Sequence, residues 1–520
     1  MVELVLPLAM IDTLTAAADW VVVLPLVLCL MGAAATLMLR KSGGLTFMFA
    51  VLIVVAVMVC EVTLLLRVVE SGPLAMTMGK WLPPFGISFA ADIFGAGFAL
   101  AASVVTLVIL IYAQAERGPD AGSDGFHSMV LLLLAGVTGS FLTGDLFNLY
   151  VWFEVMLISS FGLIVLGGRP AQLDGAVKYG FINFLATTFF LLALGLLYGL
   201  LGTLNMADIL RVAPSANPAA MAGVAALLLL AFGMKAAAFP VNAWLPAAYH
   251  TPPAVISALF AGLLTKVGIY AMLRALVVLL PSSRDLLEPV LVAVAVATLL
   301  IAPLGAIAET NLRRAVGFLV IGGVGSVLAG IAIPSLAGVS GAGLYVFHAI
   351  LTMTALYLVA GLVEWQTGQT DTRRMGGLYA ASAPTSILFL VLVLATAGVP
   401  PFLGFWPKLL LLQAGLGDGR WVGGLVAAAL VINAVLTLIA GSRLWAHIFW
   451  RYTPDGVAVI AAPPRSGAWT RLGATGVLVA VIVAAGLWPN SLFEALRLGA
   501  PDLIDPSRYV AAIGLAGGTP

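Results

Sequence analysis

Long apolar runs separated by short polar connections recur along nearly the whole chain. They have the length of about 20 residues that a helix needs to cross a bilayer, and they lack the short alternating pattern of a membrane β-strand. The pattern predicts fourteen spans, centred near residues 29, 56, 101, 135, 158, 190, 230, 267, 297, 324, 351, 398, 435 and 479. We therefore expect an all-α integral membrane protein with both termini on one side of the membrane.

Two spans are interrupted by prolines, which cannot donate the backbone hydrogen bond that continues a helix. The seventh breaks at Pro240 and Pro246, and the twelfth at Pro400 and Pro401. Because the broken spans are five apart, spans four to eight and nine to thirteen are predicted to be two inverted five-helix repeats, an arrangement that places transport sites at discontinuous helices. The predicted division is 1–125 for a three-helix N-terminal segment, 126–282 and 283–452 for the repeats, and 453–520 for a last helix and tail.

Composition supports the membrane assignment, since hydrophobic residues make up 62% of the 520 residues, charged residues 9%, and the mean hydropathy is +1.12. These values exclude a string of soluble domains, and the absence of a basic patch argues against a nucleic-acid partner. The natural surroundings of such a chain are the lipid bilayer and other membrane proteins.

The basic residues predict the orientation. Of 24 Lys and Arg residues, 13 fall in the odd-numbered connections. These are Arg40, Lys41, Arg117, Arg169, Lys178, Arg313, Arg314, Arg373, Arg374, Arg443, Arg451, Arg465 and Arg471. Six fall in the even-numbered connections, two in the C-terminal tail and three inside spans. The positive-inside rule places the odd connections in the cytoplasm and both termini outside.

Three of the chain's lysines, Lys235, Lys266 and Lys408, lie inside spans, where a charge is costly and normally faces a bundle interior or a water-filled cavity. Glu154 is the acid placed most plainly within a span, and it is the expected partner of Lys235. Burial favours the neutral form of each group and mutual attraction favours the charged forms, so such a pair makes a switchable proton site. Lysine suits this role because, unlike arginine, it can release its proton when buried.

The three lysines together suggest a proton path, because Lys235 and Lys408 lie beside the proline breaks and Lys266 falls between them if spans seven, eight and twelve pack together. The alternative for Lys235 is a static pair with Glu154 or an ammonium that snorkels to the interface. All arginines are expected in connections, at span ends or in the tail, shallower than these lysines.

Histidines and further acids add weaker candidates. His348 lies within a span and suits proton transfer near neutrality, although a packed, hydrogen-bonded histidine fits the pattern equally well. His250, in the seventh connection, could relay protons between Lys235 and Lys266 or could be a solvated loop residue. Glu61 lies six residues before Arg67, which suggests a structural pair or a peripheral position as readily as a transport role. Asp92 and Asp145, near span ends, are expected to cap helices.

Several chemistries have no support in the sequence. The four histidines are too scattered for a haem site, and Cys29 and Cys60 lie in apolar runs and form no cluster for iron and sulfur. No glycine-rich phosphate loop follows a strand. We therefore expect no cofactor, no metal centre and no catalytic constellation, and thus a protein that is not an enzyme.

Four motifs give the chain a family resemblance: FNLYVWFEVMLISSFGLIVLGG, GMKAAAFPVNAWLP, TPPAVISALFAGLLTKVGIYA and GVPPFLGFWPK. With these it resembles the proton-translocating antiporter-like subunits shared by respiratory complex I and the Mrp cation/proton antiporters, most closely the D subunits of Mrp, from about Asp92 to His447. The resemblance implies fourteen helices, two inverted repeats and a hydrated proton path across the midplane. It carries the functional residues of the family onto Glu154, Lys235, Lys266 and Lys408.

One position departs from the family pattern. Many relatives have a lysine shortly after the histidine that corresponds to His348, whereas this chain has Thr352, Met353 and Thr354. The expected path past His348 therefore uses the histidine, threonine hydroxyls or water.

The resemblance implies a proton-conducting subunit of a Mrp-type Na⁺/H⁺ antiporter in the cytoplasmic membrane of a prokaryote, working with other membrane subunits. The first alternative is a proton-pumping subunit of a complex I-like or membrane-bound hydrogenase assembly. A structural membrane subunit is a third, although a scaffold has no reason to keep three buried lysines. Few carboxylates lie in the interior, so Na⁺ is expected to be handled partly by another subunit.

Overall fold

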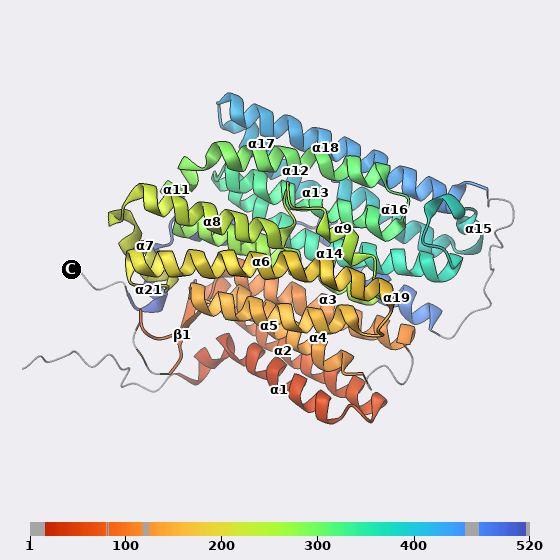
Figure 1. The fold of residues 1–520 in the computed structure, drawn as a ribbon, viewed down its shortest axis with the longest axis horizontal. Coiled ribbons are helices and arrows are strands. Elements are labelled where there is room, and N and C mark those ends of the chain that lie inside the picture. Colours follow the sequence, from red (N-terminus) through yellow and green to blue (C-terminus); the bar gives the residue numbers. More distant parts are fainter. Residues whose placement is uncertain (1–15, 80, 82, 118–123, 453–466, 516–520) are drawn as a thin grey trace, which may run out of the picture.

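Nearly every element of the chain is a helix, and the long helices lie side by side along the long axis of the molecule (Figure 1). The computed structural model describes residues 16–79, 81, 83–117, 124–452 and 467–515. Arg465, which contributed to the predicted orientation, lies outside these residues. The mainly helical architecture confirms the predicted fold class.

The fourteen predicted spans are confirmed. Within the described residues, eleven helices are long and apolar enough to cross a membrane, and three shorter apolar helices complete the set. The spans are α1 (Leu24–Met38), α2 (Gly43–Ser71), α3 (Ile93–Arg117), α4 (Phe126–Leu142), α5 (Leu146–Val165), α6 (Pro170–Leu201), α8 (Pro218–Ala236), α10 (Ala254–Leu273), α12 (Glu288–Ala308), α13 (Leu312–Ala332), α14 (Leu336–Thr367), α16 (Ala383–Ala397), α18 (Trp421–Trp445) and α19 (Ala468–Leu487).

Shorter elements join the spans. They are the 3₁₀ helices η1 (Ala17–Val22), η2 (Ala213–Ser215) and η4 (Thr372–Arg374), the π-helical turns η3 (Arg274–Leu279) and η5 (Ala446–Trp450), and α7 (Met206–Val212), α9 (Trp244–Tyr249), α11 (Pro281–Leu286), α15 (Leu378–Ala381), α17 (Phe405–Gly417), α20 (Asn490–Ile504) and α21 (Ser507–Ile513). An antiparallel hairpin, β1 (Leu74–Thr77) and β2 (Ser88–Ala91), links α2 to α3. The hairpin packs against η1 and α21, so the first and last described elements meet at one end of the bundle, as an even number of spans requires (Figure 1).

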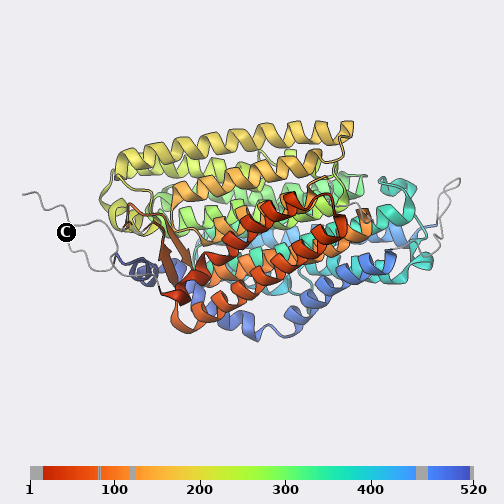
Figure 2. The same cartoon turned by 90° about the horizontal axis from the view of Figure 1, so that it is seen from below.

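Burial divides the helices into inner and outer ones. Every residue of α10 is buried, so this helix lies at the centre of the bundle. In contrast, α6 exposes Val177, Phe181 and Phe184 along one face, which is compatible with lipid or a neighbouring membrane subunit. The helices α1 and α2 are also peripheral, at the lower edge in Figure 1 and nearest the viewer in Figure 2.

The two predicted interruptions are confirmed. The seventh span stops at Ala236, where Ala237 takes a left-handed conformation, and resumes as α9. The twelfth stops at Ala397, where Gly398 takes a left-handed conformation, and resumes as α17. Pro240 lies in the first break and Pro400 and Pro401 in the second, whereas Pro246 lies within α9. Both breaks leave the last carbonyls of a half-helix without helical partners.

Candidate functional site

The predicted site residues lie on a row of neighbouring helices. Along this row α5 packs against α6, α6 against α8, α8 against α10, α10 against α14, and α14 against α17. The charged or titratable side chains on it are Glu154 on α5, Lys235 on α8, Lys266 on α10, His348 on α14 and Lys408 on α17. All are buried except Glu154, which is half-buried. Helices far apart in the sequence therefore bring these groups into one layer of the bundle.

Glu154 and Lys235 interact without touching. The Glu154 carboxylate attracts the Lys235 ammonium electrostatically, but no ion pair within 4.0 Å joins these two described residues. Lys235 Nζ instead lies 5.0 Å from the ring centroid of Phe153, a cation–π distance. Oε1 of Glu154 is buried and has no hydrogen-bond partner within the described chain. Glu154 and Lys235 therefore do not form a direct ion pair in this structure.

At the first break, the carbonyls at the end of α8 accept hydrogen bonds from groups other than the lysine. The carbonyl of Gly233 accepts from the N–H of Ala238, and the carbonyl of Met234 accepts from Trp244 Nε1 at 3.0 Å. Lys235 in the last turn of α8 is stabilised by the negative end of the helix dipole. Its ammonium makes no hydrogen bond to the part of the chain that the structure describes and lies over the ring of Phe153.

At the second break, the lysine itself donates to the carbonyls at the end of the half-helix. Lys408 Nζ donates to the carbonyls of Thr396 at 3.1 Å and Ala397 at 2.9 Å, the last two residues of α16. A Cβ on Gly398 would lie 2.6 Å from Lys408 Cδ, so only glycine leaves room for the lysine to reach back across the break. The lysine-capped half-helix was not predictable from spacing.

His348 lies between two of the lysines. Both Lys266 and Lys408 interact electrostatically with its imidazole. Its Nδ1 shares a 3.1 Å hydrogen bond with Thr352 Oγ1, whereas its buried Nε2 has no partner among the described residues and lies against Gly404 of the second break. The threonine hydroxyl next to this histidine is therefore that of Thr352.

Lys266 is the most enclosed of the three lysines. Its Nζ donates to the carbonyl of Ala261 at 2.6 Å and to Thr265 Oγ1 at 3.2 Å, both on its own helix. Beside it a cavity of about 10 Å³ lies between α10, α13 and α14, with Gly323 and Ala349 in its wall. That volume is close to the minimum for one water molecule, whose presence would extend the reach of the ammonium.

His250 lies half-buried at the end of α9, with Nδ1 2.9 Å from the carbonyl oxygen of Pro246. Burial lowers the pKa of this histidine, and the nearby Arg313 and Arg314 lower it further. A fully solvated loop histidine is therefore excluded. Within the described chain it forms no hydrogen bond with Lys235 or Lys266, and its relay role stays a prediction.

A set of tyrosine hydroxyls near Glu154 was not predicted. Tyr179 OH and Ser160 Oγ share a 2.6 Å hydrogen bond, and Tyr179 also interacts electrostatically with Glu154. The ring of Tyr249 lies in the same aromatic cluster as that of Tyr179, since both contact Trp244 and Phe260. The hydroxyl of Tyr249 is fully buried and has no hydrogen-bond partner in the described part of the chain. A tyrosine within an apolar run was the one available signal, because a buried hydroxyl needs a partner.

A half-buried ion pair lies close to Tyr357. Tyr357 OH donates to the carbonyl of Arg313 at 3.1 Å, and Arg313 Nε lies 2.9 Å from Glu364 Oε2. Arg313 also donates to Ser257 Oγ at 3.2 Å. Arg313 and Glu364 lie at the end of the bundle that carries the odd connections.

Two expectations about charges were wrong. Arg67 pairs with Asp19 at 3.2 Å and not with Glu61, which is neither peripheral nor paired but fully buried. Arg274 lies in the π-helical turn that continues α10 and is as buried as Lys235, each being 5% exposed. Sequence spacing missed Arg274 because its partner lies on a distant segment.

The partner of Arg274 is Asp92, which forms a buried ion pair with it and also accepts from the N–H of Gly95 at 2.8 Å. The predicted capping role of Asp92 is therefore confirmed, with an ion pair added. Asp145 caps α5, since its Oδ1 accepts from the N–H of Asn148 at 2.8 Å, and this prediction is also confirmed.

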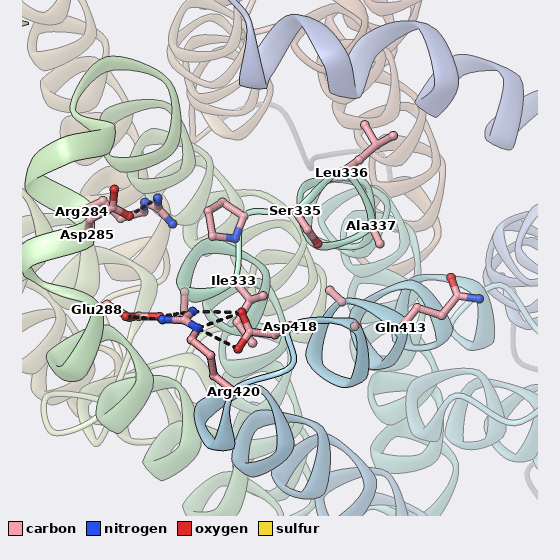
Figure 3. A pocket seen from close by; sticks show the side chains of 14 residues that line it. Arg284, Asp285, Glu288, Ile333, Ser335, Leu336, Ala337, Gln413, Asp418 and Arg420 are labelled. Atoms are coloured by element: carbon pink, nitrogen blue, oxygen red, sulfur yellow. Dashed lines mark hydrogen bonds and ion pairs between the residues drawn. The ribbon is translucent and has the colours of Figure 1, made fainter.

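A polar cavity of about 590 Å³ opens where the connections α11–α12, α13–α14 and α17–α18 meet (Figure 3). Arg420 lies in its centre and binds Glu288 at 2.6 Å and Asp418 at 2.9 Å. Arg284 and Asp285, which also line the cavity, form a second ion pair. Arg420 is shared by two acids, so the three acids and two arginines leave the lining with one excess negative charge.

A bundle of fourteen spans with buried ionisable side chains beside two helix breaks has the features of a membrane transporter. The comparison with protein families gives the family. The model of the family described as "NADH:quinone oxidoreductase/Mrp antiporter, TM" matches residues 143–437, and the chain belongs to this family.

Curated relatives cover almost the whole chain. The D subunit of the Na⁺/H⁺ antiporter of Bacillus subtilis is 32% identical over 496 residues, which cover 95% of this chain and 99% of the relative. The D subunit of the Na⁺/H⁺ antiporter of Alkalihalophilus pseudofirmus is 32% identical over 502 residues, with the same coverage. A putative antiporter subunit of Staphylococcus aureus is 34% identical over 82% of this chain and 85% of its own length.

Solved structures show the same fold. A chain of the Mrp complex from Dietzia sp. superposes with a TM-score of 0.88 at 28% identity, covering 96% of this chain and all of that one. A chain of an archaeal membrane-bound sulfane sulfur reductase gives 0.83 at 27% identity, covering 95% and 99%. A chain of respiratory complex I from Thermus thermophilus gives 0.78 at 23% identity over 96% and 100%, and shares the fold.

Proposed function

We propose that this chain is the proton-translocating subunit of a multi-subunit Mrp-type Na⁺/H⁺ antiporter. The observation that carries the proposal is the row of buried lysines and His348 on successive packed helices, two of which are broken beside a lysine. Relatives named as the D subunits of Na⁺/H⁺ antiporters, similar over nearly the full length, support it. Protons would pass among Glu154, Lys235, Lys266, His348 and Lys408, with His250 as a peripheral relay.

The proposal includes an environment and an internal symmetry. The chain would lie in the cytoplasmic membrane of a prokaryote with both termini outside, among other membrane subunits that share the handling of Na⁺. The segments 126–282 and 283–452 would be inverted repeats, each with one broken helix. Matching breaks at α8–α9 and α16–α17, five spans apart, support this division.

The second candidate is a proton-pumping membrane subunit of a redox-driven assembly. The similarity to a chain of the membrane-bound sulfane sulfur reductase favours it. Full-length relatives named as antiporter subunits weigh against it. Neighbouring genes for hydrophilic iron–sulfur subunits would support this candidate, and genes for small membrane subunits would support the antiporter.

The decisive experiment is Lys235→Ala in the assembled complex, with Lys178→Ala as the control. Removing Lys235 leaves Glu154 without its attracting charge, so proton-coupled Na⁺ export in membrane vesicles should stop at unchanged abundance. Lys178 is exposed, and among the described residues its one ion pair is with Asp174 one turn away on α6, so its removal should leave transport intact. Near-normal export by Lys235→Ala would refute the proposed path.

A further inference from the structure

Glu61 is a buried acid that the lysine row does not use. It lies on the inner face of α2, in line with Val57 and Leu64, and is 0% exposed. Helices α1, α3 and α4 surround it, and the titratable groups that face it are the thiols of Cys29 on α1 and Cys60 beside it on α2. No lysine, arginine or histidine of the described chain forms an ion pair with it.

Two hydroxyls approach the carboxyl from neighbouring helices. Thr138 Oγ1 on α4 donates to Glu61 Oε1 over 3.4 Å, and Ser103 on α3 approaches the same carboxyl. Glu61 Oε2 and Ser103 Oγ are both fully buried, and neither has a hydrogen-bond partner within the described residues. Buried polar groups are rarely left in this state.

Ser103 differs from nearby hydroxyls in a way that points to the carboxyl. Thr106 on α3 and Ser140 on α4 donate to backbone carbonyls one turn earlier, each at 2.7 Å. This local bond is the usual way for a helical hydroxyl to be satisfied inside a membrane. Ser103 forgoes it, so its oxygen remains available as an acceptor next to Glu61.

A proton on Oε2 would give both carboxyl oxygens a hydrogen-bond partner. The protonated oxygen becomes a donor to Ser103 Oγ, Oε1 continues to accept from Thr138, and no buried charge remains. An ionised carboxylate would keep an unpaired charge in an apolar surrounding, which is strongly disfavoured. Sodium fits less well, because two carboxyl oxygens and two hydroxyls fall short of the roughly six oxygen ligands that hard cations gather.

We propose that Glu61, Ser103 and Thr138 form a second proton-binding site, separate from the lysine row, in which Glu61 holds a proton in this conformation and releases it during transport. The released proton leaves a carboxylate, so the site must open to solvent or receive another positive charge before it reloads. The release of the proton rests on the proposed function in proton transport. The presence of a bound proton in this conformation does not depend on that function.

The test combines vibrational spectroscopy with transport in the assembled complex. Infrared spectra at neutral pH should contain the C=O stretch of a protonated carboxyl that Glu61→Gln removes. Ser103→Ala should shift this band to higher frequency, because the carboxyl loses its acceptor, and this variant keeps the test valid if Glu61→Gln fails to assemble. If there is no such band, or if neither substitution changes it, Glu61 does not hold a proton at neutral pH.

Transport measurements then test whether Glu61 releases its proton. Glu61→Gln should lose most proton-coupled Na⁺ export, while the control Glu70→Gln, at an exposed position of the same helix, should keep it. If Glu61→Gln removes the band but keeps full transport activity, Glu61 does not release its proton during transport. It is then a neutral acid with a structural role only. Loss of export in Glu61→Gln together with full activity of Lys235→Ala would instead refute the lysine path and retain the Glu61 site.

Discussion

The ammonium of Lys408 donates a 2.9 Å hydrogen bond to the carbonyl of Ala397, the residue at which α16 ends. A helix that stops inside a membrane leaves carbonyls that need donors, and a positive charge at that end also interacts favourably with the helix dipole. Lys408 supplies both from the other side of the break. The charge of this lysine and the geometry of the broken twelfth span are therefore linked.

Replacing Gly398 with alanine should displace Lys408. The new Cβ would lie 2.6 Å from Lys408 Cδ, and the φ of +85° disfavours any side chain. The control Gly368→Ala has a φ of +67° and open space, so it should cost only the backbone strain of about 1–2 kcal/mol. Both variants should lower the unfolding temperature in detergent, but only Gly398→Ala should also abolish transport. Equal activities would show that the lysine position is unimportant.

Lys408→Arg should fail to support transport. The guanidinium keeps the positive charge, but arginine effectively never releases its proton in a protein. Proton-coupled export and membrane abundance should be measured together, with Lys178→Arg as the surface control. An active arginine variant would show that a fixed charge at the second break suffices.

Much of the lysine row and its two helix breaks was predictable, because the sequence signals for them are local. A lysine inside an apolar run and a proline that ends a helix are visible without any tertiary information, and Lys235, Lys266, Lys408 and both breaks followed from them. Span number and the single end shared by the first and last described elements followed from run lengths and their even count.

Contacts between helices were not predictable, because they depend on how each helix is rotated. A helix such as α10, buried on every side, carries no periodic pattern that reveals its facing partner. The same reason hid the capping of α16 by Lys408, the pairing of Arg274 with Asp92, and the inward face of Glu61. Spacing along one helix suggested Arg67 as the partner of Glu61, whereas in the fold Arg67 pairs with Asp19.

Tyr249→Phe should slow transport while making the protein no less stable. The ring packs against Trp244 and Phe260, and phenylalanine keeps those contacts. Its hydroxyl has no partner among the described residues, so removing it relieves a buried polar group worth about 1–3 kcal/mol. If the hydroxyl connects Tyr179 to Tyr357 during proton uptake, the rate of proton-coupled export should fall.

The matched control for this variant is Tyr112→Phe. Its hydroxyl donates to the carbonyl of Leu358 at 3.2 Å, so its removal should cost about 1 kcal/mol of stability and leave the transport rate unchanged. Normal transport in Tyr249→Phe would remove that tyrosine from the proton route.

Asp92→Asn should destabilise the bundle strongly. It leaves Arg274 charged and buried beside Tyr270 and Tyr509, and breaking a buried pair in this way costs about 3–5 kcal/mol. Thermal unfolding of the purified protein should show a marked fall, and Asp92→Asn combined with Arg274→Met should recover much of it. No recovery in the double variant would mean that Asp92 acts mainly as the cap of α3.

The remaining prediction concerns Na⁺, for which few acids are available. In the polar cavity Asp285 is paired with Arg284, while Glu288 and Asp418 share Arg420. Glu154 is attracted to Lys235, and Glu61 is held by Thr138 in an apolar surrounding. Across the residues that the structure describes, no three His, Cys, Asp or Glu side chains gather into a group that could hold a metal ion.

Because a hard cation stripped of water needs roughly six oxygen ligands, we expect the full assembly to exchange Na⁺ for protons and this chain alone to lack that activity. The purified chain and the complete complex should be reconstituted in parallel, a pH gradient imposed, and Na⁺ uptake followed. Proton uptake without Na⁺ movement in vesicles of the isolated chain would agree with a proton-handling subunit. Robust exchange by the isolated chain would place the cation route within its own helices and contradict the division of labour proposed here.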